Sequence, residues 1–260
     1  MLLALDIGNT NVTVGVFQGE KLRATFRLGT DVRRMSDEYG VFLLNLLPRE
    51  NIQPADIRKA VICSVVPPLT STFVELCKQF FKTEALVVEA GIRTGIRILA
   101  DNPREVGADR VADGVAAFKL YGGPVIVVDF GTATVFDAIS KDGDYMGGAI
   151  APGIKIAAEA LFERASKLPR IDLVRPRSAV GRTTVTSMQS GLVFGYVGLV
   201  EGIVARIRRE MGADTPVIAT GGNADIIARE TTIFQAVNPD LTLIGLRIIH
   251  ELNDRTEEAH

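Results

Sequence analysis

The stretch ALDIGNTNVTVGVF, residues 4–17, decides the fold, and VVDFGTATVFDAIS, residues 127–140, repeats its pattern. In each stretch an aspartate ends an apolar run, a glycine follows two residues later, and small hydroxyl or amide residues come next. An apolar run that stops at Asp-x-Gly and then resumes is typical of two strands joined by a tight turn. The sequence therefore predicts the same strand–turn–strand unit twice in one chain.

The segments around these turns predict two similar α/β halves. Strands are expected at 2–6, 12–17, 22–28, 59–65 and 85–89, and helices at 37–47 (with Ser36 as N-cap), 69–81 and 108–121. In the second half, strands are expected at 124–129, 133–140, 145–150 and 216–220, and helices after Gly153 and at 184–211, 223–229 and 242–252. Because each half opens with three strands and the Asp-x-Gly turn, we predict a weak internal repeat, with a chance echo of a short motif as the alternative.

The length suits two domains, predicted at 1–115 and 116–255 with a frayed tail at 256–260. Within the helix at 184–211, the uncharged stretch 187–200 is shorter than the roughly 18 residues of a spanning segment. Four glycines recur there at helical spacing, at 191, 195, 198 and 202. We therefore expect a buried helix at a domain or subunit junction, with no membrane association.

Composition excludes several classes of protein. The net charge is −2 and no basic run stands out, so nucleic-acid binding is not expected, and phosphate binding would rely on backbone N–H groups and metal ions. Cys63 and Cys77 form no CxxC, and His250 and His260 lie near the end of the chain, so a zinc site is not expected. The acidic start lacks the basic region of a signal peptide, and we expect a cytoplasmic protein with two buried thiols.

The paired turns have the composition of a phosphate site. An aspartate at the end of a buried strand is costly unless a cation or donor meets it, and Mg²⁺ prefers one or two carboxylates plus substrate phosphates. Gly8 and Gly131 would permit a backbone conformation that side chains block and a close approach to a ligand. The alternative is that each Asp-x-Gly is a simple hairpin turn. No Walker A or G-x-G-x-x-G motif occurs, and Asp129-Phe130-Gly131 lacks the companions of a protein kinase.

The segment Gly107-Ala108-Asp109-Arg110 is the candidate for proton transfer. It stands at a predicted helix N-terminus, where free N–H groups favour an anion such as a carboxylate. Asp109 would be the base and Arg110 its charge partner; the alternative is that Asp109 only caps the helix and Arg110 is a surface residue. Gly221-Gly222 could let an adenine ring lie against the backbone, or could be a plain strand-to-helix turn.

Taken together, the motifs resemble the superfamily of acetate and sugar kinases, Hsp70 and actin, and within it the type III pantothenate kinase family. The segments that match, in the order of the family, are DIGNTN at 6–11, NPREVGADR at 102–110, DFGTAT at 129–134, GGAIAPG at 147–153, TTVTSMQSG at 183–191 and ATGG at 219–222. The resemblance implies two actin-like, ribonuclease H-like domains with a nucleotide cleft between them. It also implies transfer of the ATP γ-phosphoryl group to pantothenate, which is the first step of coenzyme A synthesis.

The resemblance also implies roles for individual residues. The ATP-binding residues would be Asp6, Ile7, Gly8, Asn9, Thr10, Asn11, Val12, Thr13 and Thr132. The pantothenate-binding residues would be Gly107, Ala108, Asp109, Arg110 and, across a homodimer interface, Thr184, with Asp109 as proton acceptor. Asp129 would bind a monovalent cation, K⁺ or NH₄⁺, and Asp6 would lie near Mg²⁺.

One position departs from the pattern of the family. Many relatives carry Tyr in Y-x-N-P, where this chain has Ala100, which puts substrate affinity in doubt more than reaction type. Two other functions stay open at this point: a kinase of the same superfamily with another small hydroxylated acceptor, and a non-catalytic regulator that kept the fold. The intact GADR segment and both aspartate turns favour an enzyme over the regulator.

Overall fold

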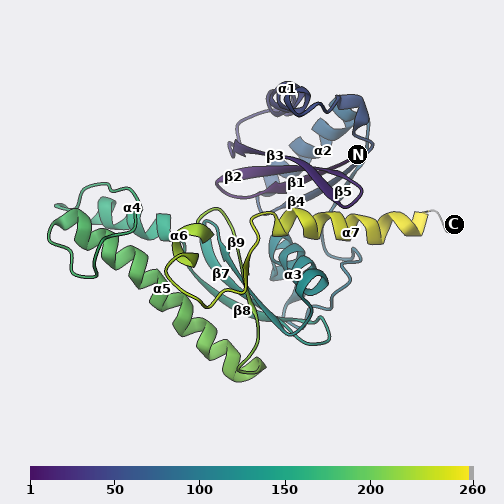
Figure 1. The fold of residues 1–260 in the computed structure, drawn as a ribbon. Helices are drawn as coiled ribbons and strands as arrows, with labels where there is room; N and C mark the ends of the chain where they lie inside the picture. The colour runs from purple at the N-terminus through teal and green to yellow at the C-terminus, as the bar shows by residue number, and fades with distance from the viewer. Residues whose placement is uncertain (258–260) are drawn as a thin grey trace. The chain divides into compact units, whose positions relative to one another are not determined.

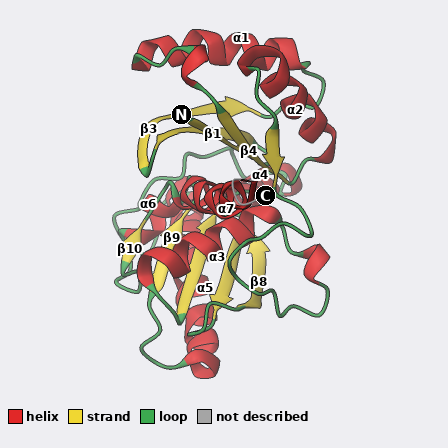
Figure 2. Cartoon of the chain, turned by 90° about the vertical axis from the view of Figure 1, so that its right-hand side faces the viewer, coloured by secondary structure: helices red, strands yellow, loops and turns green. Residues whose placement is uncertain are grey.

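The structure is a computed structural model, and it describes residues 1–257. The chain forms two compact units (Figure 1). Unit 1 contains Met1–Gly95, Asp101–Ala116 and the chain from Leu241 onward, and unit 2 contains Ile96–Ala100 and Ala117–Asp240. Each unit has its own five-stranded sheet, drawn in yellow in Figure 2, so the predicted α/β class is confirmed.

The sheet of unit 1 has the strand order β3-β2-β1-β4-β5. Its strands are β1 (Leu2–Ile7), β2 (Asn11–Gln18), β3 (Lys21–Gly29), β4 (Lys59–Ser64) and β5 (Ala85–Val87). The first three form an antiparallel meander, and β4 and β5 continue the sheet in parallel with β1. The unit also has α1 (Ser36–Leu46), α2 (Pro67–Phe81), α7 (Leu241–Glu257), the first part of α3 (Ala108–Tyr121), and short 3-10 turns at Leu47–Glu50, Pro54–Asp56 and Pro103–Glu105.

Alternation along the strands separates the two faces of this sheet. Leu3, Leu5 and Ile7 of β1 pack in one core with Tyr39 of α1 and Phe73 of α2. The opposite face of β1 and β2 is covered by α7, and Figure 1 shows α1 and α2 on one side of the sheet and α7 on the other. Asp6 stands on the α7 face because it alternates with Leu5 and Ile7.

Unit 2 repeats this plan. Its sheet has the order β10-β9-β6-β7-β8, which matches the order in unit 1 when β6 is aligned with β1. The elements are β6 (Val125–Phe130), β7 (Ala133–Ile139), β8 (Tyr145–Pro152), β9 (Val217–Thr220), β10 (Ala236–Val237), α4 (Ile154–Arg164), α5 (Thr184–Met211) and α6 (Ala224–Ala228). The predicted repeat is therefore confirmed. The two-residue strand β10 was missed because it is too short to show a periodicity.

Helix α5 is the one helix among the described residues that is long and apolar enough to cross a membrane by length and composition. That test is also passed by core helices of soluble proteins. Leu192, Tyr196 and Val200 of α5 pack into the core of unit 2 against strand β6 residues such as Val128. This packing buries 33% of the most apolar stretch of α5, so the predicted burial of the helix holds for one side of it only.

Two helix ends differ from the sequence-based expectation. The N-cap of α1 is Met35, not Ser36, and the side chain of Glu38 accepts the Met35 N–H at 2.9 Å. Helix α7 continues to Glu257, so Thr256 and Glu257 of the predicted frayed tail are helical; residues 258–260 lie outside the description. The extension is anchored by an ion pair between Asp254 and Lys59 and by Asn253, whose side chain donates to the Arg93 carbonyl at 2.9 Å.

The unit that contains α7 also differs from the expectation. Residues 241–255 were predicted to belong to the C-terminal domain, whereas α7 contacts β1, β2 and β4 of unit 1.

Candidate functional site

The first Asp-x-Gly turn joins β1 to β2 in unit 1. Asp6 is half-buried at the end of β1, and the turn is closed by the Gly8 N–H, which donates to the Asn11 carbonyl at 3.0 Å. A Cβ on Gly8 would lie 3.1 Å from that same carbonyl oxygen, so close packing favours glycine here. Asn9 and Thr10 are exposed at the tip of the turn. Successive backbone N–H groups in such turns commonly bind anions.

Neither Gly8 nor Gly131 has φ in the left-handed region, so the predicted conformational reason for these glycines is wrong. At Gly131 a Cβ would lie 3.2 Å from a carboxylate oxygen of Asp129. Close approach, not unusual backbone geometry, accounts for both glycines.

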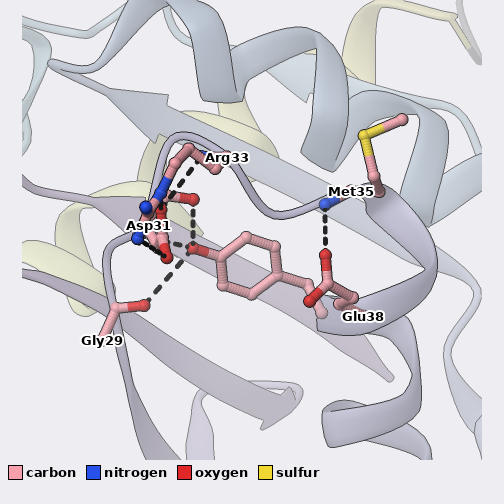
Figure 3. A network of polar contacts seen from close by, with 6 residues as sticks. Gly29, Asp31, Arg33, Met35 and Glu38 are labelled. Carbon is pink, nitrogen blue, oxygen red and sulfur yellow. Dashed lines mark hydrogen bonds and ion pairs between the residues drawn. The ribbon is translucent and has the colours of Figure 1, made fainter.

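A loop that follows β3 supports this turn from outside. The Thr30 hydroxyl donates to the Gly8 carbonyl at 2.7 Å, and the Thr30 N–H donates to the Thr10 carbonyl at 3.1 Å. The next residue, Asp31, is fixed in turn: its N–H donates to the Tyr39 hydroxyl at 2.9 Å. Its carboxylate accepts two hydrogen bonds from the guanidinium of Arg33, as Figure 3 shows. The loop therefore holds two carbonyls of the turn in place.

The second predicted segment lies at the start of α3. Asp109 is half-buried, and one of its carboxylate oxygens accepts the Arg110 N–H at 2.8 Å. The carboxylate therefore binds a backbone N–H in the first turn of the helix, as the alternative of a capping role predicted. Burial raises the pKa of Asp109, while the hydrogen bond and charge of Arg110 act to lower it. A carboxylate with a raised pKa is a stronger base. A Cβ on Gly107 would lie 2.4 Å from an Asp109 oxygen, so the glycine leaves room for this carboxylate.

Cys63 lies near both segments within unit 1. It is fully buried in β4, directly beside Asp6 in the β1–β4 pairing. The pKa of its thiol is raised well above the usual range by burial first, and then by the negative charges of Asp6, Asp109 and Asp113. Asp6 and Asp109, which are far apart in the sequence, therefore both lie in the neighbourhood of Cys63. Asp113 is itself buried and accepts the Thr242 hydroxyl at 2.7 Å.

The second Asp-x-Gly turn joins β6 to β7 in unit 2. The Asp129 carboxylate lies between Gly131 and Gly221, since a Cβ on Gly221 would come within 2.2 Å of an Asp129 oxygen. Thr132 is exposed at the turn, and its carbonyl accepts the Gly153 N–H at 3.1 Å. This bond explains why the GGAIAPG segment accompanies the turn: it fixes the turn to the end of β8.

Gly221 and Thr184 are also placed in unit 2. Gly221 has φ +89° and lies against the backbone of Phe130, so it has a structural reason to be glycine whatever binds there. The adenine hypothesis for Gly221-Gly222 stays a prediction. Thr184 is exposed at the first position of α5, next to the N-cap Thr183, whose hydroxyl accepts the Thr186 N–H at 3.2 Å.

The side chains at these turns suit cations that are shared with a ligand. Within residues 1–257, no group of three or more His, Cys, Asp or Glu side chains is arranged to hold a metal ion alone. Mg²⁺ is usually held by one or two carboxylates, with phosphate and water oxygens completing its shell. Asp6 fits that pattern, because it is a half-buried carboxylate beside an exposed turn. Asp129 is likewise a carboxylate oxygen donor at the end of a strand.

Comparison with known proteins identifies the family. The family model described as type III pantothenate kinase matches residues 2–206. The chain belongs to the type III pantothenate kinase family. It is 54% identical over 252 residues to the type III pantothenate kinase of Dehalococcoides mccartyi strain 195, with 97% of this chain and 98% of that protein covered. The enzyme of the same description from Roseiflexus sp. strain RS-1 is 53% identical over 253 residues, with 97% and 99% covered.

Solved structures support the actin-like fold. A conserved Campylobacter jejuni protein described as a Baf family transcriptional activator aligns with a TM-score of 0.64 at 20% identity, covering 97% of this chain and 99% of that one. A Sinorhizobium meliloti protein described as a 2-dehydro-3-deoxygalactonokinase aligns with a TM-score of 0.61 at 11% identity, covering 97% and 96%. At such identities the likeness shows the fold alone. The regulator hypothesis therefore gains nothing from the Baf description.

Three residues of unit 1 that lie close to this site were not singled out from the sequence as part of it. Thr30 belongs to a loop with no motif, Asp113 sits inside an otherwise apolar helix, and Cys63 is a core thiol by composition. A faint signal for Asp113 exists, since it follows Asp109 by four residues and so shares its helix face. Thr30 and Cys63 have no such signal.

Proposed function

We infer that this chain transfers the γ-phosphoryl group of ATP to pantothenate and forms 4'-phosphopantothenate, the first step of coenzyme A biosynthesis. Membership of the type III pantothenate kinase family supports the reaction. The structural observation that supports the site is that Cys63, which is paired with Asp6 across β1 and β4, is also close enough to Asp109 for that charge to act on its pKa.

The proposed step uses residues of unit 1. Asp109 accepts the proton of the primary hydroxyl of pantothenate as its oxygen attacks the γ-phosphorus, the bond to the bridging oxygen breaks, and ADP leaves. The N-terminus of α3, from Gly107 to Arg110, binds the acceptor, where the helix dipole favours an anion such as the carboxylate of pantothenate. Backbone N–H groups of the segment 6–13 bind phosphate oxygens. Asp6 would hold Mg²⁺ together with the phosphates, and the cation would supply charge neutralisation there.

Unit 2 contributes further binding residues in this proposal. Thr132 contacts ATP, and Asp129 binds K⁺ or NH₄⁺. A monovalent cation there would balance phosphate charge in a chain whose own net charge is −2. We also place the enzyme in the cytoplasm, where its two free, buried thiols, Cys63 and Cys77, would stay reduced.

A homodimer would complete the acceptor site through Thr184. Helix α5 presents an open glycine face: a Cβ on Gly191, Gly195 or Gly198 would meet nothing within 4 Å. Such a face admits another backbone closely. Sedimentation equilibrium tests this, because Gly195→Leu should shift the protein toward monomer, whereas an unchanged mass would remove the glycine face from the interface.

A coupled assay of ADP release tests the reaction. We expect ADP formation to require pantothenate and to be stimulated when Na⁺ is replaced by K⁺ or NH₄⁺. ADP release that is unaffected by pantothenate, but stimulated by another small alcohol, would support the alternative acceptor. No ADP release with any acceptor, from a protein that is folded, would contradict the kinase assignment.

A further inference from the structure

A row of side chains near the end of β1, on one face of the unit 1 sheet, contains an arginine. Asp6 lies opposite Thr13 in the β1–β2 pairing, and Thr13 lies opposite Arg27 in the β2–β3 pairing. Directly opposed residues on neighbouring strands project from the same face of a sheet. Asp6, Thr13 and Arg27 therefore form one row across three strands, which we call the Asp6 row.

The Asp6 row is the last row on this face that spans all three strands, because β1 ends at Ile7 while Asn11 and Gly29 pair beyond it. In the next row inward, Gly15 lies opposite Thr25, and a Cβ on Gly15 would meet Leu243 of α7 at 2.9 Å. Helix α7 thus covers that row closely. In the Asp6 row, by contrast, Asp6 and Thr13 are only half-buried and Arg27 is exposed. Its side chains stand beside the turn whose N–H groups are proposed to bind phosphate.

Among the described residues near this turn, Arg27 differs from Arg33 and Arg34 because its side chain binds no other residue. Arg33 is bound to the Asp31 carboxylate through two hydrogen bonds of 3.1 and 3.2 Å. Arg34 lies over the ring of Phe42, 5.1 Å from its centroid. Within residues 1–257, the side chain of Arg27 makes no hydrogen bond or ion pair. A solvated surface arginine is the ordinary explanation for such a residue, and its position in the row argues against it.

The repeat supplies an internal comparison. The corresponding row of unit 2 runs from Asp129 to Val135 on β7 and on to Ile150 on β8. Both partners of Asp129 are apolar, while both partners of Asp6 can donate hydrogen bonds to an anion. The shared framework does not itself require a hydroxyl and a guanidinium in this row, so their presence in unit 1 alone points to a ligand there.

We propose that Arg27 binds β- or γ-phosphate oxygens of the ATP held by the segment 6–13, which rests on the proposed kinase function. Neighbouring strands lie about 4.8 Å apart, so Arg27 is roughly 10 Å from Asp6 between Cα atoms, and an extended arginine spans most of that distance. A guanidinium can pair with two phosphate oxygens at once. The sequence predicted that phosphate binding would rely mainly on backbone N–H groups and metal ions. In this proposal the side chain of Arg27 also takes part.

Nucleotide binding by calorimetry tests the proposal, with MgATP, MgADP and AMP as ligands. Arg27→Ala should weaken MgATP about 10- to 100-fold, the usual effect of losing a hydrogen bond to a charged group, and should leave AMP within twofold. Arg27→Lys should recover part of the loss, since it keeps the charge without the fork. Arg23→Ala is the matched control, because Arg23 is an exposed arginine of the same strand that is bonded to Gln18 instead.

The outcomes separate this proposal from the proposed function. An unchanged MgATP affinity in Arg27→Ala would overturn the role of Arg27, while the wild type still binds ATP and phosphorylates pantothenate. An equal loss for MgATP and AMP would also overturn it, since the effect would then not act through the β- or γ-phosphate. Failure of the wild type to bind MgATP at all would instead refute the kinase function. Thermal unfolding of each variant, expected within a few degrees of wild type, confirms that the fold is kept.

Discussion

The hydroxyl of Thr30 offers a precise way to loosen the phosphate turn without touching the ligand. Thr30→Val removes the donor to the Gly8 carbonyl but keeps the branched shape that suits this extended segment. The backbone bond from the Thr30 N–H to the Thr10 carbonyl, at 3.1 Å, is left in place. The change therefore removes one of the two bonds between the supporting loop and the turn.

The expected magnitude follows from the exposure of the acceptor. A hydrogen bond of ordinary geometry contributes about 0.5–1.5 kcal/mol net, and more is lost when a buried partner is left unsatisfied. Gly8 is only half-buried, so water can replace the hydroxyl and the cost stays near 1 kcal/mol. If the turn binds phosphate only in its closed geometry, that free energy should appear as an approximately fivefold rise in the Kd of MgATP.

Calorimetric titration of MgATP and urea unfolding measure the two parts of this effect. Thr30→Ser keeps the hydroxyl and should bind MgATP within twofold of wild type. If Thr30→Val instead binds MgATP as tightly as wild type and unfolds at a lower urea concentration, the bond stabilises the fold alone. The reasoning that the loop pre-forms the phosphate turn would then be refuted.

Three further substitutions probe the surroundings of the site. Thr242→Val should destabilise the protein by about 1–3 kcal/mol in urea, because it leaves a buried Asp113 oxygen without its 2.7 Å donor. Gly245→Ala should cost about 1–3 kcal/mol or more, because the added Cβ would lie 2.0 Å from the Ala112 carbonyl oxygen; a neutral effect would show that α7 and α3 can move apart cheaply. Asp109→Asn should be more stable than wild type at neutral pH, by about 1.4 kcal/mol for each unit by which the Asp109 pKa is raised in the folded state. A raised pKa favours the folded wild type only at pH values below the ordinary pKa of an aspartate, and this contribution is lost as the pH rises. The difference in thermal stability between Asp109→Asn and wild type should therefore disappear in acid. A difference that does not change with pH would contradict the burial of this charge.

Much of the fold could be predicted because local patterns carry it. The alternation in LRATFRL and the two Asp-x-Gly turns predicted the strands of both meanders, and the weak repeat predicted two similar halves, which the matching strand orders of the two sheets confirm. The position of α7 was not predictable in the same way. Its contacts are with β1, β2 and β4, at the opposite end of the chain, and no local pattern specifies a partner so distant.

The chemistry of the site was predictable by residue type, but its assembly was not. Asp6 and Asp109 stand in recognisable segments, whereas their proximity to Cys63 depends on how β4 and α3 pack. Arg27 was predicted only as part of an alternating strand. Its place beside Asp6 requires two strand registers at once, and a shift of one residue in either would turn it to the other face.

Single-turnover phosphoryl transfer by Asp109→Asn, measured by rapid quench with labelled ATP and saturating pantothenate, tests the central claim most directly. If Asp109 takes the proton of the acceptor hydroxyl, the transfer rate should fall on the order of 10²- to 10⁴-fold. The Kd values of MgATP and pantothenate should stay close to those of wild type. A transfer rate within a few-fold of wild type would contradict the role of Asp109 and would require another group at the start of α3 to act as the base.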